Sequence, residues 1–258
     1  MRKFNATTIP RYPDPVPVDH FPSTHATWID AQLTIAEAGE SSAGVGPANA
    51  ARAALRAHLM ERYYDALRTY VRTGALVRLG EPDEIVGEFF ARTVDAPGFL
   101  RRWRESRLTL RRWMMNAIAF HCQGALRDQR RAAEREVPSD DMDASASRSA
   151  DAARAFDRAW AVALAGEAFA VAQRDAEERG RPQDALVFRM HALDGMTHRE
   201  IAGQLGITET QSAHAARRVS ERMRDAVRTL LRDEGVPTAE LEAAVAEVLA
   251  LVGEAAGE

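Results

Sequence analysis

Apolar residues recur every three or four positions along most of the chain, and this spacing constrains the fold more than any other feature. It places them on one face of an α-helix, as with Leu55, Leu59, Tyr63 and Leu67 in a helix that Asn49 can cap. No segment alternates apolar and polar residues in the manner of a β-strand. The sequence therefore predicts an all-α protein.

Changes in composition divide the chain into five parts. Residues 1–47 are rich in Pro, Ser, Thr and Gly, which predicts an extended N-terminal arm. Helical patterns fill 48–135 and 155–235, and we expect these segments to form two separate helical domains. Between them, 136–154 is small-residue-rich and acidic, which predicts a flexible linker. Residues 236–258 predict an acidic C-terminal helix, and we expect its deletion to change activity more than folding.

The composition narrows the classes of function. With 46% hydrophobic and 28% charged residues, the chain resembles an ordinary soluble globular protein. It has no run of 18 apolar residues and its first residues lack the apolar core of a secretory signal, so we expect a cytoplasmic protein without a membrane span. The single cysteine, Cys122, excludes a disulfide framework, and the scattered histidines predict no metal site. No phosphate-binding loop or catalytic constellation is evident, so we expect neither a cofactor nor an enzyme.

The net charge of −4 hides an uneven distribution. Residues 99–135 hold ten Arg against three acids, and 197–232 hold seven Arg against four acids. Residues 81–95 instead hold five acids and one Arg, and 233–258 hold seven acids and no base. Separate basic and acidic blocks favour contacts with two kinds of partner.

Residues 197–231 carry the pattern of a helix-turn-helix. Thr197 and Thr208 can cap its two helices, and Gly206 can adopt the left-handed conformation that the turn requires. Ser212 lies on the buried stripe of the second helix, where an aliphatic residue would fit better. The polar residues that face outward near the start of that helix are Thr210, Gln211, His214, Arg217 and Arg218. A recognition helix places such residues against base edges in the major groove, whereas the alternative is a helical hairpin with solvated arginines.

The segment 99–116 combines arginine with tryptophan, a pairing that suits single-stranded nucleic acid. The side chains that can follow phosphates are Arg101, Arg102, Arg104, Arg107, Arg111 and Arg112. An exposed Trp103 or Trp113 could stack on a displaced base, which is worth roughly 1–3 kcal/mol per base. Trp113 and Phe120 fall seven residues apart on one helix face, and this spacing also fits packing in a core.

Several motifs occur together and in the order found in one family. EPDEIVGEFFARTV (81–94), RRWMMNAIAF (111–120) and the segment 183–231 resemble regions 2 and 4 of extracytoplasmic-function sigma factors of the sigma-70 family. FPSTHATWI near the N-terminus, the linker and the C-terminal helix resemble a long-linker subgroup with a C-terminal extension. The resemblance implies a region 2 helical bundle and a region 4 helix-turn-helix.

The resemblance also implies partners and sites. RNA polymerase core would contact the acidic helix through Asp83, Glu84, Glu88 and Phe89. Region 2 would recognise and melt the −10 element of promoter DNA through Arg101, Arg102, Trp103, Arg104, Arg107, Arg111, Arg112 and Trp113. Region 4 would bind the −35 element through Thr197, His198, Thr208, Thr210, Gln211, His214, Arg217 and Arg218. An anti-sigma factor or another regulator would restrain the protein.

Linker length agrees with this reading, since about 20 extended residues span roughly 65 Å and elements one and a half duplex turns apart lie about 50 Å from each other.

Two other functions stay open. One is a helix-turn-helix regulator that binds duplex DNA without polymerase core, and the other is a helical adaptor that binds no DNA.

Overall fold

The computed structural model describes residues 25–38, 45–74, 76, 79–133 and 142–256. Within these ranges every regular element is a helix, which confirms the all-α prediction. The elements are α1 (His25–Ala38), α2 (Val45–Thr73), α3 (Pro82–Phe89), the π-helix η2 (Phe90–Val94), α4 (Phe99–Ser106), α5 (Leu110–Ala133), α6 (Met142–Glu178), α7 (Gln183–Ala192), α8 (His198–Leu205), α9 (Glu209–Asp233), the 3₁₀-helix η3 (Thr238–Glu240) and α10 (Leu241–Ala256). Among them, none combines the length and the apolarity that a membrane crossing needs.

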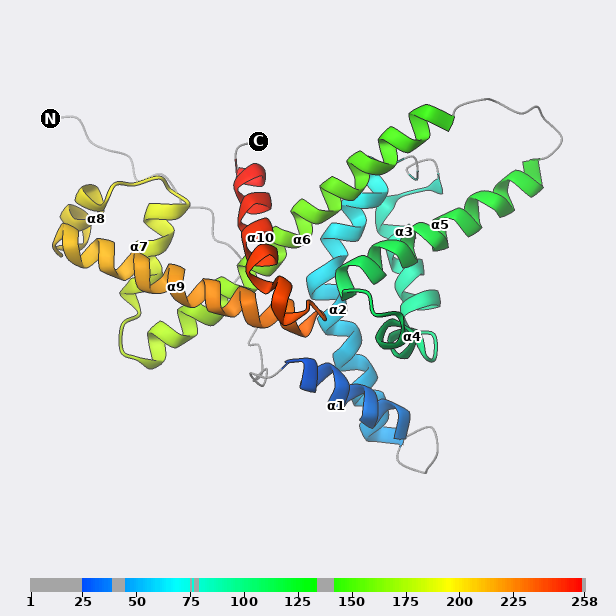
Figure 1. Cartoon of the computed structure of the whole chain (residues 1–258), viewed down its shortest axis with the longest axis horizontal. Coiled ribbons are helices and arrows are strands. Elements are labelled where there is room, and N and C mark those ends of the chain that lie inside the picture. Colours follow the sequence, from blue (N-terminus) through cyan, green and yellow to red (C-terminus); the bar gives the residue numbers. More distant parts are fainter. Residues whose placement is uncertain (1–24, 39–44, 75, 77–78, 134–141, 257–258) are drawn as a thin grey trace, which may run out of the picture.

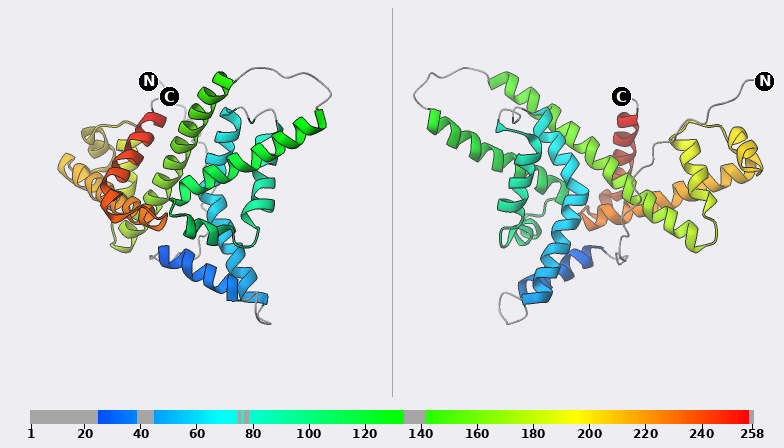
Figure 2. Two further views of the ribbon diagram at one scale, coloured as in Figure 1. Left: turned by 45° about the vertical axis from the view of Figure 1, so that its right-hand side comes forward. Right: turned by 180° about the vertical axis from the view of Figure 1, so that it is seen from behind.

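Two long helices organise the molecule. Helix α6 runs diagonally from the bundle of α2–α5 to the helical hairpin of α7 and α8, and α9 returns from that hairpin to the bundle (Figures 1 and 2). Helix α10 then packs beside α6 and α9. The main hydrophobic core draws on α1–α6, α9 and α10, with Phe89, Phe156 and Trp160 among its largest buried side chains. A second, smaller core lies in the hairpin and contains Val187, Met190 and Ile201.

The prediction of a flexible linker is wrong for residues 142–154, which form the start of α6. Residues 136–141 lie outside the described ranges. The small residues favour close packing here, because a β-carbon built on Gly74, the residue after α2, would lie only 3.4 Å from that of Ala152. Since α6 then continues through the buried Phe156 and Trp160, the two expected domains share one hydrophobic core.

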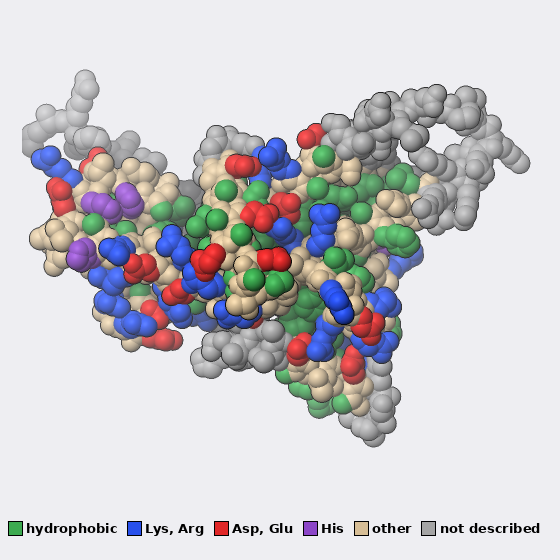
Figure 3. All heavy atoms as spheres, viewed as in Figure 1, with side chains coloured by type: hydrophobic (Ala, Val, Ile, Leu, Met, Phe, Trp, Pro, Cys, Tyr) green, Lys and Arg blue, Asp and Glu red, His purple; other side chains and the backbone are tan. Residues whose placement is uncertain are grey.

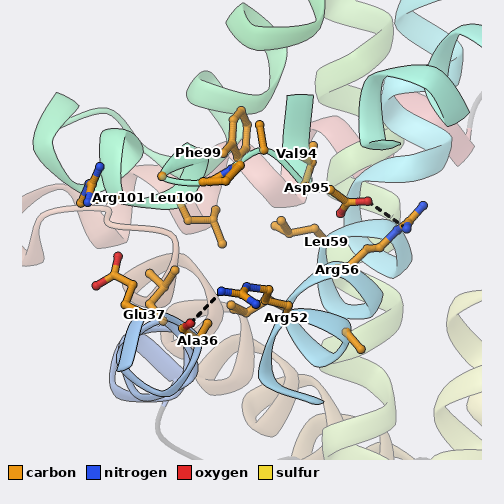
Figure 4. Close-up of a pocket in the computed structure, with 16 residues that line it drawn as sticks. Ala36, Glu37, Arg52, Arg56, Leu59, Val94, Asp95, Phe99, Leu100 and Arg101 are labelled. Atoms are coloured by element: carbon orange, nitrogen blue, oxygen red, sulfur yellow. Dashed lines mark hydrogen bonds and ion pairs between the residues drawn. The ribbon is translucent and has the colours of Figure 1, made fainter. Parts of the chain in front are cut away.

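The N-terminal arm is also more ordered than its composition suggests. Helix α1 buries Ile29 and Leu33 in the main core, and α2 begins at Val45, ahead of the expected cap at Asn49. Residues 1–24 lie outside the described ranges. The guanidinium of Arg52 donates a hydrogen bond to the carbonyl oxygen of Ala36 (3.0 Å), which ties α1 to α2 beside an open cavity of about 550 Å³ (Figure 4).

Helix α10 contributes to folding. It places Leu241, Val245 and Val248 in the main core, because they lie on one face at helical spacing. Burying such a side chain stabilises a fold by about 1.5–3 kcal/mol. Deleting residues 236–258 would therefore also affect folding, and the expectation that it changes activity more than folding stays a prediction.

Candidate nucleic-acid interface

The helix-turn-helix has the local geometry that its sequence predicts. Thr197 caps α8, where the Glu200 amide donates to Thr197 Oγ1 (3.3 Å) and Glu200 Oε2 accepts from the Thr197 amide (2.8 Å). The Thr197 amide and the Thr197 hydroxyl (2.7 Å) both donate to the Glu200 carboxylate, and these two bonds lower the pKa of Glu200. Gly206 ends α8 with φ of 67° in the left-handed region. Thr208 caps α9 through the same reciprocal pair of bonds with Gln211 (3.1 and 2.8 Å). Both caps satisfy amides that a helix start leaves without a partner.

The polar Ser212 on the buried face of α9 has a specific partner. Its side chain is fully buried, and Oγ lies 3.1 Å from Nδ1 of His198 at the start of α8. The ring of His198 stacks on that of His191 with centroids 4.1 Å apart, and Nδ1 of His191 lies 2.9 Å from the Met196 carbonyl oxygen. A polar contact thus replaces the apolar contact expected between the two helices. His198 holds the hairpin together as well as lying near its surface.

Four of the predicted −35 residues remain exposed at the start of α9: Thr210, Gln211, His214 and Arg217. Figure 3 shows basic and histidine side chains gathered on the surface over α7–α9. Thr197 and Thr208 use their hydroxyls in caps, and Gln211 also engages its amide oxygen there. The exposed face of α9 therefore has the shape and charge that suit a DNA major groove.

Arg218 differs from its neighbour Arg217. Its guanidinium donates two hydrogen bonds, both 2.9 Å long, to the carboxylate of the buried Asp184 on α7. This contact raises the pKa of Arg218 and fixes α7 against α9. Arg217 instead pairs with Glu221 on the solvent side of α9 (2.8 Å). Because the protein itself engages the Arg218 side chain in this conformation, its assignment as a DNA contact stays a prediction.

The basic segment around α4 and α5 loses two of its proposed DNA contacts to internal packing. Trp103 is only 7% exposed, and its Nε1 donates to the Leu108 carbonyl oxygen (2.9 Å), so its ring is unavailable for stacking on a base. Arg111 pairs with Asp157 (3.6 Å) and Glu247 (3.2 Å), and its guanidinium lies 4.4 Å from the centre of the Trp160 ring. Both residues are structural in this conformation.

The other arginines of this segment divide into two kinds. Arg104 pairs with Asp30 of α1 (3.2 Å). The side chains that are exposed and form no ion pair with any described residue are those of Arg101, Arg102, Arg107 and Arg112. These four remain able to contact phosphates.

An open groove of about 650 Å³ lies between η2, α4 and α5. The residues that line it include Arg92, Arg102, Leu108, Trp113, Asn116 and Phe120. The Phe120 ring is 70% exposed, whereas Trp113 is half-buried against Phe99 with ring centroids 5.6 Å apart. The buried Trp113 Nε1 donates no hydrogen bond to any described residue. The groove is therefore lined by both aromatic rings and arginine side chains.

Sequence reasoning missed the part of this groove that comes from η2 and the middle of α5. Asn116 and His121 line it, and His121 Nδ1 lies 3.2 Å from Thr93 Oγ1. Burial lowers the pKa of His121, which favours its neutral form. The spacing of Trp113, Asn116 and Phe120 along one face of α5 was the available signal.

The acidic helix α3 presents three of its four predicted polymerase contacts to solvent. Asp83, Glu84 and Glu88 are exposed, and Asp83 pairs with Arg68 of α2 (3.0 Å). Phe89 is fully buried, with its ring centroid 6.5 Å from that of Phe99, so its assignment to a polymerase surface is wrong for this conformation. In the part of the chain that the structure describes, no three potential metal ligands come together.

Comparison with known proteins identifies the helical hairpin and the start of α9. The model of the family described as "Sigma-70, region 4" matches residues 181–223, which span α7, α8 and the exposed end of α9. No curated protein and no solved structure gives a significant match. The match covers the two capped helices, the Gly206 turn and the exposed residues described above. The C-terminal part of this chain therefore carries a sigma-70 region 4 domain, the helix-turn-helix of sigma factors that bind promoter DNA.

Proposed function

We propose that the protein is an extracytoplasmic-function type RNA polymerase sigma factor. Its region 4 domain reads duplex DNA at the −35 element, and the bundle of α2–α5 acts as region 2, binding polymerase core and melting the −10 element. The observation that supports the region 2 role is the aromatic and basic groove between η2, α4 and α5. It occurs in the same chain as the region 4 domain, and α9, which begins in that domain, ends in the main core.

The groove suits a single DNA strand for physical reasons. Phe120 offers an exposed ring face for stacking, and Asn116 offers both donors and acceptors for a base edge. Arg102 lines the same groove, and Arg101 and Arg112 lie nearby in sequence, with guanidinium groups that form no ion pair with any described residue. The bases of an intact duplex cannot reach such a groove, so it favours separated strands.

The acidic face of α3 supplies the contact to polymerase in this proposal. Glu84 is exposed and forms no ion pair with described residues, whereas Asp83 and Glu88 exchange their pairs with Arg68 and Arg92 for basic groups of the polymerase. Such charges speed association more than they add affinity. Phe89 supports this face from the core.

Run-off transcription tests the proposal directly. Purified polymerase core is incubated with a library of genomic fragments, with and without the protein. Discrete start sites that require the protein support a sigma factor. Specific duplex binding by the protein alone, without new start sites, supports a regulator that never melts DNA. If neither new start sites nor specific duplex binding is observed, the result supports the adaptor function.

Phe120→Ala is expected to reduce open-complex formation by roughly fivefold or more, since a stacked base contributes roughly 1–3 kcal/mol. The melting temperature should stay unchanged because the ring is 70% exposed. Permanganate footprinting of the −10 region measures strand opening, and duplex binding at the −35 element should match wild type. Val162→Ala, which truncates an exposed apolar side chain of α6 outside this groove, is the matched control. Equal opening by the Phe120→Ala variant and wild type would contradict the role of the groove.

A further inference from the structure

The end of α9 makes an unusually buried polar contact with the N-terminal bundle. Glu234, which follows α9, is 1% exposed, and its Oε1 accepts hydrogen bonds from Arg62 Nη1 and Trp160 Nε1, both at 3.2 Å. Its backbone carbonyl oxygen accepts from the amide of Leu110, the first residue of α5 (2.9 Å). One residue therefore joins α9 to α2, α5 and α6.

The residues after Glu234 cover the turn that leads into α5. A β-carbon built on Gly235 would lie 3.9 Å from both the Leu108 carbonyl oxygen and the Trp103 ring, so the chain passes directly over this turn. Helix α10 then extends alongside and pairs Glu247 with Arg111 (3.2 Å). The contact thus covers a turn and an arginine of the segment that we predict to engage the −10 element.

This contact fixes the end of α9 at the start of α5. The rise of an α-helix places Gln211, on the exposed end of α9, about 35 Å from Glu234 and hence from the start of α5. The closed arrangement therefore sets the exposed end of α9 and the start of α5 at a fixed separation.

We propose that residues 233–256 form a latch, which holds the end of α9 against the bundle, covers Arg111, and must release the bundle before the protein can open promoter DNA. The proposal rests on the proposed sigma function. Release exposes Leu241, Val245 and Val248, so the free protein stays closed. Polymerase core or promoter DNA opens the latch by binding the open state more tightly.

A reversible crosslink tests the latch. Arg111→Cys and Glu247→Cys are combined and joined with a bismaleimide that contains a cleavable disulfide. The native Cys122 is buried and burial raises its pKa to about 11, which protects it from the reagent. The same double variant treated with N-ethylmaleimide is the reference, because both cysteines are then modified by a maleimide but are not linked to each other. We expect the crosslinked protein to lose at least about tenfold in open-complex formation and to recover it on reduction.

The matched control crosslinks α9 to α10 without joining either to the bundle. Arg228 and Glu242 form the equivalent pair there (2.7 Å), so Arg228→Cys with Glu242→Cys should accept the same reagent. This crosslink should leave transcription at the level of its N-ethylmaleimide control. Equal transcription by the locked and unlocked 111–247 proteins would overturn the latch while leaving the sigma function intact. Absence of transcription by wild type would overturn the proposed function, and with it a latch that gates promoter opening.

Charge reversal provides a second test without crosslinking. Glu247→Arg places a like charge beside Arg111 and should raise initiation by about two- to fivefold. Glu254→Arg makes the same change of net charge on α10, at an exposed residue without an ion pair to any described residue. If both variants gained equally, the gain would reflect general attraction to DNA and the latch would be wrong.

Discussion

Replacing Arg62 with alanine is expected to lower the free energy of unfolding by about 3–5 kcal/mol, because it leaves a buried carboxylate without its cationic partner. Arg62 Nη1 lies 3.2 Å from Glu234 Oε1, and Nη2 lies 2.6 Å from Glu167 Oε2. After the change the Glu234 carboxylate keeps the hydrogen bond that Trp160 Nε1 donates to it (3.2 Å) but has lost its cation. Urea denaturation followed by circular dichroism measures the loss.

The loss should depend on pH. Burial already raises the pKa of Glu234 above its ordinary value of 4.5, and Arg62 opposes that rise. Without Arg62 the pKa rises further, so the folded variant holds its proton at pH values where the unfolded chain has released it. A raised carboxyl pKa stabilises the fold at low pH and this stability is lost as pH rises through the folded pKa. The deficit of the variant should therefore be larger at pH 8 than at pH 5.

Arg68→Ala is the matched control for this prediction. Arg68 also lies on α2 and pairs with a carboxylate, that of Asp83 (3.0 Å), but both side chains are solvent-exposed. Such pairs contribute about 0–1 kcal/mol. The buried network of Arg62 with Glu234 and Glu167 would be contradicted if Arg62→Ala lowered the free energy of unfolding no more than Arg68→Ala does. It would also be contradicted if the loss caused by Arg62→Ala grew toward low pH.

Arg217→Ala is expected to weaken binding of the −35 duplex by roughly five- to a hundredfold, as loss of a base or phosphate contact does. The melting temperature should not change, since Arg217 forms only a solvent-exposed pair with Glu221. Fluorescence anisotropy with a promoter duplex at fixed salt concentration measures the affinity. His214→Ala tests the neighbouring exposed position in the same assay.

The adjacent Arg218 should behave in the opposite way. Arg218→Ala removes two hydrogen bonds to the buried Asp184 and is expected to destabilise the region 4 domain by about 1–3 kcal/mol. Hydrogen exchange in α7 should report the loosening. If Arg218→Ala instead weakened DNA binding without destabilising the domain, while Arg217→Ala bound normally, the two roles would be reversed.

These two arginines show where sequence reasoning stops. Both are consecutive residues on the outward side that the sequence pattern of α9 predicts, and their neighbours in sequence do not distinguish a DNA contact from an internal ion pair. The difference comes from Asp184, which is 34 positions away in sequence and is brought close by the packing of α7 on α9. The same holds for Trp103 and Phe89, whose aromatic rings fit a binding surface or a core equally well until neighbouring helices are placed.

The linker and the N-terminal arm were misjudged for a related reason. The linker contains few large apolar side chains and the arm is rich in Pro, Ser, Thr and Gly, and both compositions favour disorder in isolation. In the fold, Ala152 packs closely at Gly74, and Ile29 and Leu33 complete the main core. A few contacts with helices that are distant in sequence are enough to order such segments. The average composition of a segment does not reveal these contacts.

The sequence by itself determined the helical content and the helix-turn-helix with its caps at Thr197 and Thr208 and its turn at Gly206. These features depend on interactions within three or four residues, which the local pattern contains. The tertiary structure alone decided that α6 and α9 join both halves in one core, that Arg62 and Glu234 are buried together, and that Trp113 and Phe120 line a groove. Each of these depends on residues far apart in the chain, whose burial and pairing are set by the packing of whole helices.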